Sequence, residues 1–193
     1  MTPEPVMEGL LEAMGRLAEA NNIYKKDHHR KVAMLGKAIA NELGLYADSA
    51  SAIWAAGAVH DIGEALVPID ILCKATKLTH IEFMLLKEHP EKAYNILKEI
   101  CFPWPVAETV LQHHERLDGS GYPRGLRGDA IRLESKVLSV ADVAVAILSD
   151  RPYRYAMTLE KAILELTHGM AGALDVNAVN ACVTLLSERK FGF

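Results

Sequence analysis

The feature that most constrains the fold of this chain is a set of histidines and aspartates that lie far apart in the sequence. The set comprises His28, the doublet His60-Asp61, His89, the doublet His113-His114, and Asp142. Both doublets end apolar stretches that should face inward as helices. Because a buried carboxylate is costly without a cation, Asp61 and Asp142 each need a positive partner. A metal ion would compensate both carboxylates. For Asp142, a nearby arginine would compensate the charge equally well.

A single histidine on an apolar helix is more often a hydrogen-bonded core residue than a metal ligand, but sequence-adjacent pairs favour ligation. If the set converges, its imidazoles and carboxylates can hold two divalent metals that share one bridging aspartate. Such a pair activates water and clamps a phosphoryl group during in-line displacement. Nitrogen and oxygen donors without thiolate suit iron, manganese or zinc. The pattern therefore favours metal-dependent phosphoester hydrolysis. His29, His80 and His168 fit no such pattern and are interpreted as surface or core residues.

Apolar residues at three- and four-residue steps predict an all-helical chain without strands. The expected helices cover residues 6–20, 28–43, 106–117, 133–148, 158–166 and 176–186. Ser49 is a candidate cap for a further helix that ends at His60-Asp61, and Thr79 with Glu82 resembles a capping box. We expect residues 1–20 to form an N-terminal helix, as an extension or linker, and residues 21–193 to form one domain.

Composition limits the compartment and the partners. A formal net charge of -4 gives no basic footprint for a DNA or RNA polymer. Three scattered cysteines fit reduced thiols in the cytoplasm. The N-terminus lacks the features of a signal peptide, and no apolar run approaches the roughly 18–20 residues that span a bilayer. A soluble, cytoplasmic protein without a membrane partner is expected.

One long irregular stretch, residues 118–129, holds four glycines and a proline directly after the histidine doublet. It can be a tight turn, but this position favours a wall of an active site, with Gly121, Tyr122 and Pro123 as candidate substrate contacts. Further along, Arg151 and Arg154 follow the helix of Asp142 and can fork onto phosphate oxygens. The alternative is that these arginines only complement the helix dipole.

Together these residues resemble the HD-GYP family, a branch of the HD phosphohydrolase superfamily, over about residues 19–185. The strongest matches are His60-Asp61-Ile62-Gly63, His89-Pro90, the run from His113 to Pro123, and Ala141-Asp142-Val143. The resemblance implies a compact helical bundle with the glycine-rich loop beside a buried metal centre. It also implies hydrolysis of cyclic di-GMP, a bacterial second messenger, to linear pGpG, with a second cut to GMP left open.

Carried over by position, the resemblance implies two metal sites that share Asp61. The first would use His28, His60, Asp61 and Asp142, and the second Asp61, His89, His113 and His114. Family members with three metals carry a glutamate four residues before the first ligating histidine, where this chain has Tyr24. Two divalent ions are therefore expected, with iron or manganese favoured over zinc. Arg151 and Arg154 match the family's phosphate-contacting positions.

Three positions depart from the family pattern. Glu64 replaces a lysine that the family usually places near the scissile phosphate, Asn22 replaces an aspartate, and Val145 replaces another aspartate. The first two positions are expected to lie close together, so their joint change removes a cation–carboxylate pair and leaves an anion near the phosphate. Asp61 and Glu64 are the catalytic candidates, with Glu64 acting as a general acid or reaching a metal.

Other interpretations stay open. A degenerate family member would bind metal and nucleotide, or a partner signalling domain, without efficient turnover. The partner in that case would be a diguanylate cyclase of the GGDEF type docked on the loop around Tyr122. A third interpretation is a hydrolase for another nucleotide. The N-terminal helix is a candidate dimerisation element, which would make the protein a homodimer.

Overall fold

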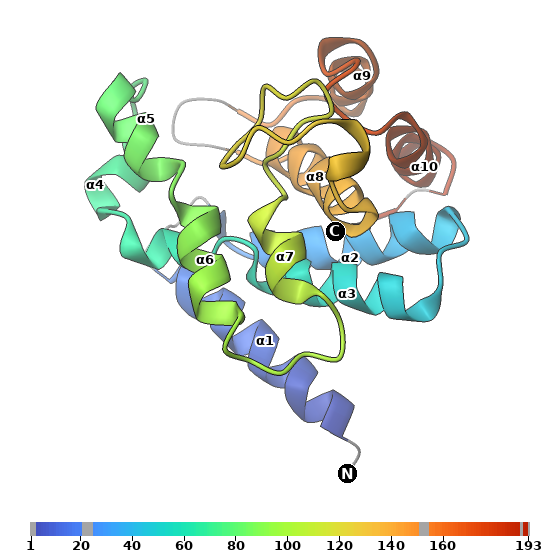
Figure 1. Cartoon of the computed structure of the whole chain (residues 1–193). Helices are drawn as coiled ribbons and strands as arrows, with labels where there is room; N and C mark the ends of the chain where they lie inside the picture. Colours follow the sequence, from blue (N-terminus) through green and yellow to red (C-terminus); the bar gives the residue numbers. More distant parts are fainter. Residues whose placement is uncertain (1–2, 21–24, 151–154, 190, 193) are drawn as a thin grey trace.

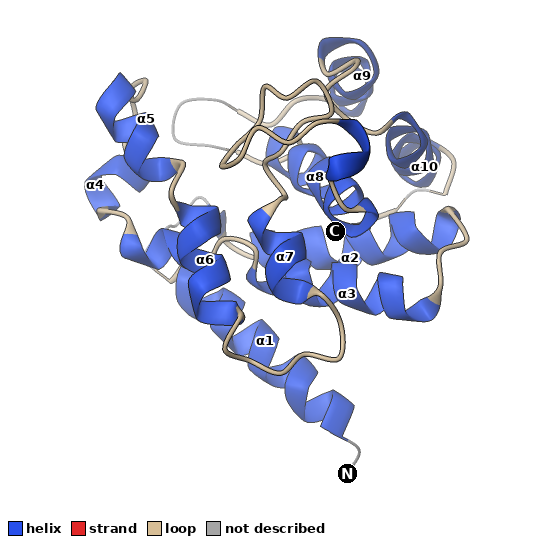
Figure 2. Cartoon of the chain, in the orientation of Figure 1, coloured by secondary structure: helices blue, strands red, loops and turns tan. Residues whose placement is uncertain are grey.

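The computed structural model describes residues 3–20, 25–150, 155–189 and 191–192. Within these residues the secondary structure consists of helices and the loops between them, with no strand (Figure 1 and Figure 2). The all-helical fold predicted from the sequence is therefore confirmed. Four positions discussed above lie outside the described residues, namely Asn22, Tyr24, Arg151 and Arg154.

In chain order the described helices are α1 (Pro3–Glu19), α2 (His28–Glu42), α3 (Ala47–Val59), the 3-10 helix η2 (Ile62–Leu66), α4 (Ile69–Leu72), α5 (His80–Leu86), α6 (His89–Leu97), α7 (Val106–Leu111), the 3-10 helix η3 (Gly128–Ala130), α8 (Leu133–Ile147), α9 (Leu159–Leu164), the π-helical segment η4 (Glu165–Gly169) and α10 (Val176–Ser187). The longest connection between described helices is the glycine-rich loop between α7 and η3. None of the described helices combines the length and apolar character needed to traverse a bilayer.

Most helix ends agree with the sequence signals. The predicted capping box is present, since Thr79 Oγ1 accepts the Glu82 N–H and the Glu82 carboxylate accepts the Thr79 N–H. The predicted cap at Ser49 is wrong, because α3 already begins at Ala47 and the Ser49 hydroxyl donates to Glu134 of α8 at 3.3 Å. A left-handed Gly44 with φ 68° ends the preceding helix and lets α3 begin early.

The predicted helix over 106–117 is wrong beyond Leu111, where α7 ends. The backbone there forms turn hydrogen bonds, such as Glu115 N–H to Gln112 O at 2.9 Å, and the Leu117 N–H then donates to Ala173 O at 2.9 Å. His113 and His114 consequently lie in a turn after the helix. This turn, rather than a helical face, sets the direction of both imidazoles.

Helices α2, α3 and α8 form the centre of the molecule and pack against one another. The largest side chains between them are fully buried, among them Val32, Leu35, Ile39, Ile53 and Leu138. Helix α1 packs on α3, α6 and α7 pack together on one side, and α10 packs on α2 and α8 (Figure 1). Burial of this apolar surface fixes the helix ends that carry the polar residues described below. A separate role for residues 1–20 as linker or dimerisation element stays a prediction.

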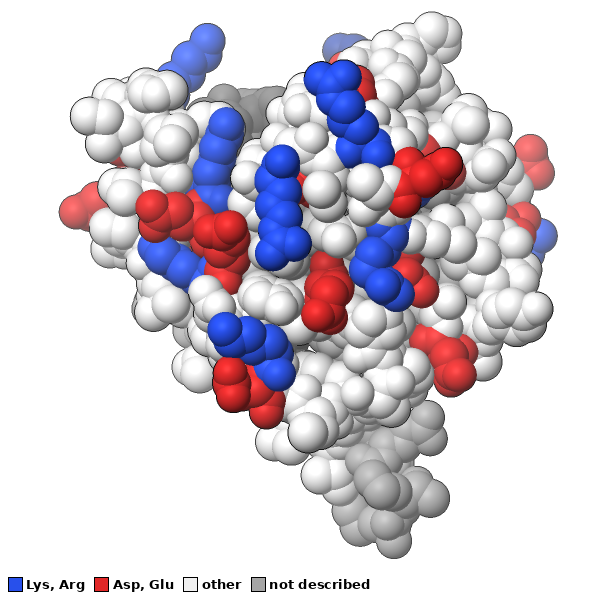
Figure 3. Space-filling view, in the orientation of Figure 1, with Lys and Arg blue, Asp and Glu red and all other residues white. Residues whose placement is uncertain are grey.

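Charged side chains of both signs are interspersed over the surface. On the face drawn in Figure 3, lysines and arginines lie beside aspartates and glutamates, and no region of one sign covers that face. The formal net charge is -4. This face therefore offers no continuous basic stripe along which a nucleic acid backbone could run.

Two glycines let the central helices approach closely. A Cβ at Gly57 of α3 would lie 2.7 Å from Ala33 Cα of α2, and a Cβ at Gly36 of α2 would lie 2.8 Å from Ile53 Cγ2. The first contact involves backbone that cannot move aside by a rotamer change. The α2–α3 spacing therefore depends on the absence of a side chain at residue 57.

Gly57→Ala is expected to destabilise the protein by about 1–3 kcal/mol, because the methyl group must push α2 away from α3. Gly9→Ala is the matched control, since a Cβ at this exposed position in α1 meets nothing within 4 Å. The control should stabilise by roughly 0.5–1 kcal/mol through helix propensity. Urea denaturation measures both, and equal stability of Gly57→Ala and wild type would contradict the expectation.

Candidate metal centre

The seven histidines and aspartates singled out from the sequence converge in the structure. One group with ligand atoms within 4.8 Å of one another contains Asp61, His89, His113 and His114, and a second contains His28, His60 and Asp142. His60, His89, His113 and Asp61 are almost completely buried. These groups could hold metal ions, and the residues meet from five separate parts of the chain.

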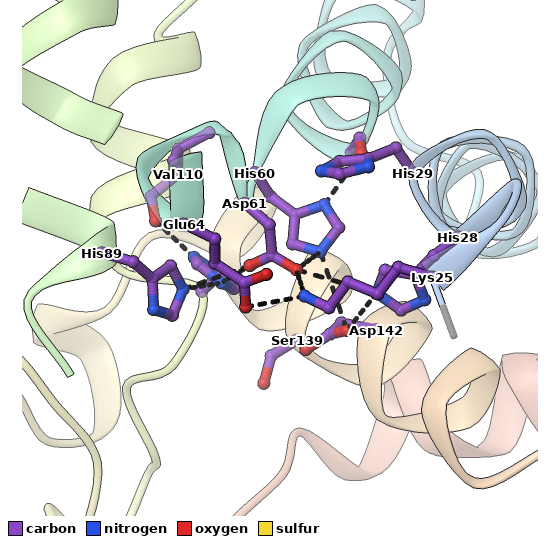
Figure 4. A network of polar contacts seen from close by, with 12 residues as sticks. Lys25, His28, His29, His60, Asp61, Glu64, His89, Val110, Ser139 and Asp142 are labelled. Carbon is purple, nitrogen blue, oxygen red and sulfur yellow. Dashed lines mark hydrogen bonds and ion pairs between the residues drawn. The ribbon is translucent and has the colours of Figure 1, made fainter. Parts of the chain in front are cut away.

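Asp61 stands between the two groups. Its Oδ1 lies 3.1 Å from His89 Nε2 and 3.6 Å from His113 Nε2, whereas its Oδ2 lies 3.1 Å from His60 Nε2 (Figure 4). The opposite oxygens of one carboxylate thus face different groups. A carboxylate in this position is able to bridge two cations.

Helix ends supply most of these side chains. His28 begins α2, His60-Asp61 directly follows α3, and His89 begins α6. Only Asp142 comes from the middle of a helix, α8. His28, His60, Asp61 and Asp142 are thus held on or directly beside the packed central helices, whereas His113 and His114 are positioned by the turn after α7.

Three imidazoles are oriented in the same way. Nδ1 of His60 donates to Gly57 O at 2.9 Å, Nδ1 of His89 to Leu86 O at 2.8 Å, and Nδ1 of His113 to Val110 O at 2.5 Å. In each case the acceptor lies three residues earlier. This bond occupies Nδ1 and turns Nε2 of each ring towards Asp61, as in many metal-ligating histidines.

A further observation supports the binding of a metal ion by these residues. His60 Nε2 is buried, and although it lies 3.1 Å from Asp61 Oδ2, the two atoms are not aligned for a hydrogen bond. Unsatisfied buried polar atoms are rare and call for an explanation. A cation coordinated by His60, His28 and Asp142 would satisfy this nitrogen, and His28 Nε2 already lies 3.1 Å from Asp142 Oδ1.

Electrostatics at the site favour cation binding. Burial lowers the pKa of His28 to about 3 and also lowers the pKa values of His113 and His114, so these imidazoles are neutral at pH 7 and able to ligate. Burial alone would raise the pKa of the Asp61 carboxyl, but His60 and Lys25 together bring it well below its usual range. The carboxylate is therefore ionised and attracts positive charge.

His60 behaves differently from the other imidazoles. Burial alone would lower its pKa, but Asp61 and Asp142 outweigh that effect and raise the pKa to about 9. At pH 7 and without a metal, His60 is accordingly protonated on both ring nitrogens. A metal ion that binds Nε2 would take the place of the proton on that nitrogen and leave the compensation of both carboxylates intact.

Lys25 is a site residue that the sequence did not reveal. Its ammonium is bonded to Asp61 Oδ2 and lies 2.7 Å from Glu64 Oε1, and the residue is only 8% exposed (Figure 4). Glu64, expected to place an anion near the phosphate, is thus paired with a cation that the sequence analysis did not foresee. Beside Lys26 in the sequence, Lys25 resembles ordinary solvated charge, and no local signal marks it.

His29 is a second residue to which sequence reasoning gave no role in the site. It is buried, its ring centroid lies 4.9 Å from that of His60, and its Nδ1 lies 2.7 Å from Glu19 Oε1. His29, His60 and Asp61 form a third group with ligand atoms within 4.8 Å. His80 and His168 are exposed, which agrees with their interpretation as surface or core residues without a role in the site.

The glycine-rich loop is anchored beside the site by Glu115. This buried carboxylate accepts the backbone N–H groups of Arg124 at 2.7 Å and of Leu126 at 2.9 Å. A Cβ at Gly121 would lie 2.5 Å from Glu115 Cα, so the loop packs directly on the segment that carries the histidine doublet. The Tyr122 ring consequently lies 4.7 Å from the His114 ring, centroid to centroid.

A cavity of about 820 Å³ lies over the site. Its floor includes Asp61, His89, His114 and Asp142, and Tyr122 lines one wall. Gly121 and Pro123, the other predicted substrate contacts, do not line it and serve to shape the loop. A further part of the lining comes from α4, α5 and the loop between them, which the sequence did not implicate. Its contributors include Ile71, Lys74, Lys77 and Phe83.

Comparison with known proteins places this site in a family context. The model of a family described as "HD domain" matches residues 12–177. The "3'3'-cGAMP-specific phosphodiesterase 1" of Vibrio cholerae is 37% identical, over 88% of this chain and 40% of the relative. The "Cyclic di-GMP phosphodiesterase" of Thermotoga maritima is also 37% identical, over 93% of this chain and 49% of the relative. The chain thus spans half or less of the length of these relatives.

Solved structures share the fold. An HDG"Y"P protein from Bdellovibrio bacteriovorus superposes with a TM-score of 0.72 at 20% identity, covering 96% of this chain and 65% of the other. A cyclic GMP-AMP specific phosphodiesterase of V. cholerae gives a TM-score of 0.69 at 16% identity, covering 94% of this chain and 49% of the other. At these identities the likeness concerns the arrangement of helices.

Glu115→Gln should loosen the glycine-rich loop without removing a metal ligand. A glutamine offers one carbonyl oxygen, so one of the two buried N–H groups loses its acceptor, at a cost of about 1–3 kcal/mol. Hydrogen exchange of the Arg124 and Leu126 amides should accelerate roughly ten- to hundredfold. The same substitution at exposed Glu99 is the control, and unchanged exchange at both amides would show that Glu115 does not anchor the loop.

Proposed function

The chain belongs to the HD domain family, and we propose that it is a metal-dependent phosphodiesterase of the HD-GYP type that hydrolyses cyclic di-GMP. The observation that carries the proposal is the placement of Asp61, whose two oxygens face separate groups of imidazoles at the floor of a large cavity. The relatives named as cyclic-dinucleotide phosphodiesterases support the same class of reaction.

We assign two divalent metals to the site, iron or manganese in preference to zinc. The proposed ligands of one are His28, His60, Asp61 and Asp142, and those of the other are Asp61, His89, His113 and His114. Imidazole and carboxylate donors without thiolate suit all three metals, and the preference for iron or manganese rests on the resemblance to the HD-GYP family. When bound, such a pair would supply an activated water and neutralise phosphoryl oxygens.

The cavity suits a cyclic dinucleotide. Its volume of about 820 Å³ lies within the usual range for ligand pockets. The Tyr122 and Phe83 rings, whose centroids lie 6.4 Å apart in an edge-to-face arrangement, give the cavity an aromatic lining for a base, while Lys77 offers a cation to the phosphates. Arg151 and Arg154, outside the described residues, stay predicted phosphate contacts.

The chain's own residues would orient one phosphodiester over Asp61 and His89. Tyr122, held by His114 and the Glu115-anchored loop, would close one side of the cavity and limit the access of bulk water. Hydrolysis breaks the bond between phosphorus and the ribose 3′-oxygen, which takes up a proton, and a water oxygen joins phosphorus. The product is linear pGpG, and a second cut would give GMP.

A substrate panel tests this proposal. Protein purified without oxygen and loaded with iron or manganese should convert cyclic di-GMP to pGpG, as followed by liquid chromatography. The panel includes 3'3'-cGAMP, because relatives specific for that nucleotide are 37% and 34% identical to this chain. Bound metal and nucleotide without product would favour the degenerate binding module, which the complete set of candidate ligands argues against.

Asp61→Ala should remove both bound metal and hydrolysis, because it deletes the only carboxylate that faces both groups of imidazoles among the described residues. Metal content by plasma mass spectrometry should fall from two ions per chain to less than one, and turnover should become undetectable. His168→Ala, at an exposed histidine, is the control and should keep both. Circular dichroism checks that the helices persist, and retained turnover in Asp61→Ala would refute the dinuclear assignment.

A further inference from the structure

Lys25 is a buried cation whose position the metal ligands alone do not explain. Lysine is almost never buried without a partner. Here the ammonium lies between Asp61 and Glu64, with all three side chains at most 11% exposed. Lys25 comes from the segment before α2, whereas the carboxylates come from the end of α3 and from η2 (Figure 4). Separate segments thus converge to place one positive charge.

This ammonium lies at the cavity rather than inside the protein core. Lys25, Asp61 and Glu64 all line the cavity, together with His28 and Asp142. By contrast, Lys74 stands farther out and is paired with Glu82 at 2.7 Å. Among the described cavity residues, Lys25 is the lysine in direct contact with the proposed bridging carboxylate.

The two carboxylates are not equivalent partners of Lys25. Asp61 belongs to a candidate ligand group, whereas Glu64 belongs to none. Divalent cations at Asp61 would draw that carboxylate towards themselves and repel the nearby ammonium. Glu64, 2.7 Å away, remains in contact with the ammonium and helps to hold Lys25 in place. Because an ammonium has three donors, weakening its bond to Asp61 gives it a donor for another oxygen.

We propose that Lys25 binds a phosphate oxygen of the nucleotide and that Glu64 is its positioning residue. The inference rests on the proposed function, since it assigns a further residue to the same cavity. A structural ion pair alone is a weaker explanation, because buried ion pairs contribute little net stability compared with apolar packing. Glu64 in this role holds a cation and does not donate a proton.

The first test measures hydrolysis in charge variants. Lys25→Met should lower kcat/KM roughly ten- to hundredfold, which is what one charge-assisted hydrogen bond contributes. Glu64→Gln should lower it less, because the ammonium remains but is held less firmly. The double variant Lys25→Glu with Glu64→Lys exchanges the charges and should recover at least part of the activity lost in Lys25→Glu. Lys98→Met, on the exposed end of α6, is the matched control.

The second test does not depend on turnover. Calorimetry should show pGpG and inorganic phosphate binding roughly ten- to hundredfold more weakly to metal-loaded Lys25→Met than to the wild type. Metal content should be unchanged. Without metal, Lys25→Met should melt roughly 5–15 °C lower than the wild type, because Asp61 and Glu64 lose their shared cation. Metal loading should remove most of that difference.

These measurements separate the inference from the proposed function. If the wild type hydrolyses no cyclic dinucleotide but Lys25→Met still binds pGpG or phosphate more weakly, the function fails and the role of Lys25 stands. Wild-type kcat/KM and pGpG affinity in Lys25→Met would overturn the role of Lys25. Loss of metal from Lys25→Met would also overturn it, because the residue would then support the metal site instead. A metal-loaded wild type that binds neither pGpG nor phosphate would overturn both.

Discussion

The cost of burying the Asp61 carboxylate organises the centre of this molecule. In a site sheltered from water an ionised carboxylate must be surrounded by positive charge or by donors. The imidazoles of His60, His89 and His113, and the ammonium of Lys25, all turn towards this one group. The packing of α2, α3 and α8 holds these side chains at fixed positions. The packed core thus fixes the positions of charged side chains as well as apolar ones. The resulting arrangement around Asp61 favours the binding of cations.

The helices and the seven histidines and aspartates of the candidate metal centre could be predicted because local sequence patterns identify both. Apolar spacing identifies the helices, and a histidine-aspartate doublet at the end of an apolar helix leaves few places for its charge except the interior. The carbonyl acceptors of His60, His89 and His113 lie three residues upstream, so the orientation of each imidazole is also a local property.

What escaped prediction depends on tertiary contacts. Helix α7 ends at Leu111 and gives way to a turn, and Leu117 of the expected helix bonds instead to distant Ala173, a contact that no periodicity reveals. Glu115 follows the histidine doublet and looks like solvated charge, but its carboxylate is buried under the loop that it anchors. The part of the cavity lining that comes from α4 and α5 was missed for the same reason. Only the folded chain brings its lysines and Phe83 near Tyr122.

Glu64 shows why a departure from a family pattern must be judged in space rather than by position. Taken alone, a carboxylate where a lysine is usual would repel phosphate. In the fold it lies 2.7 Å from Lys25, which arrives from another segment and brings a positive charge to the same part of the cavity. Coulomb energy depends on where a charge lies and not on which residue carries it. A carboxylate at one position can therefore be offset by a cation that another segment brings into contact with it in the cavity lining.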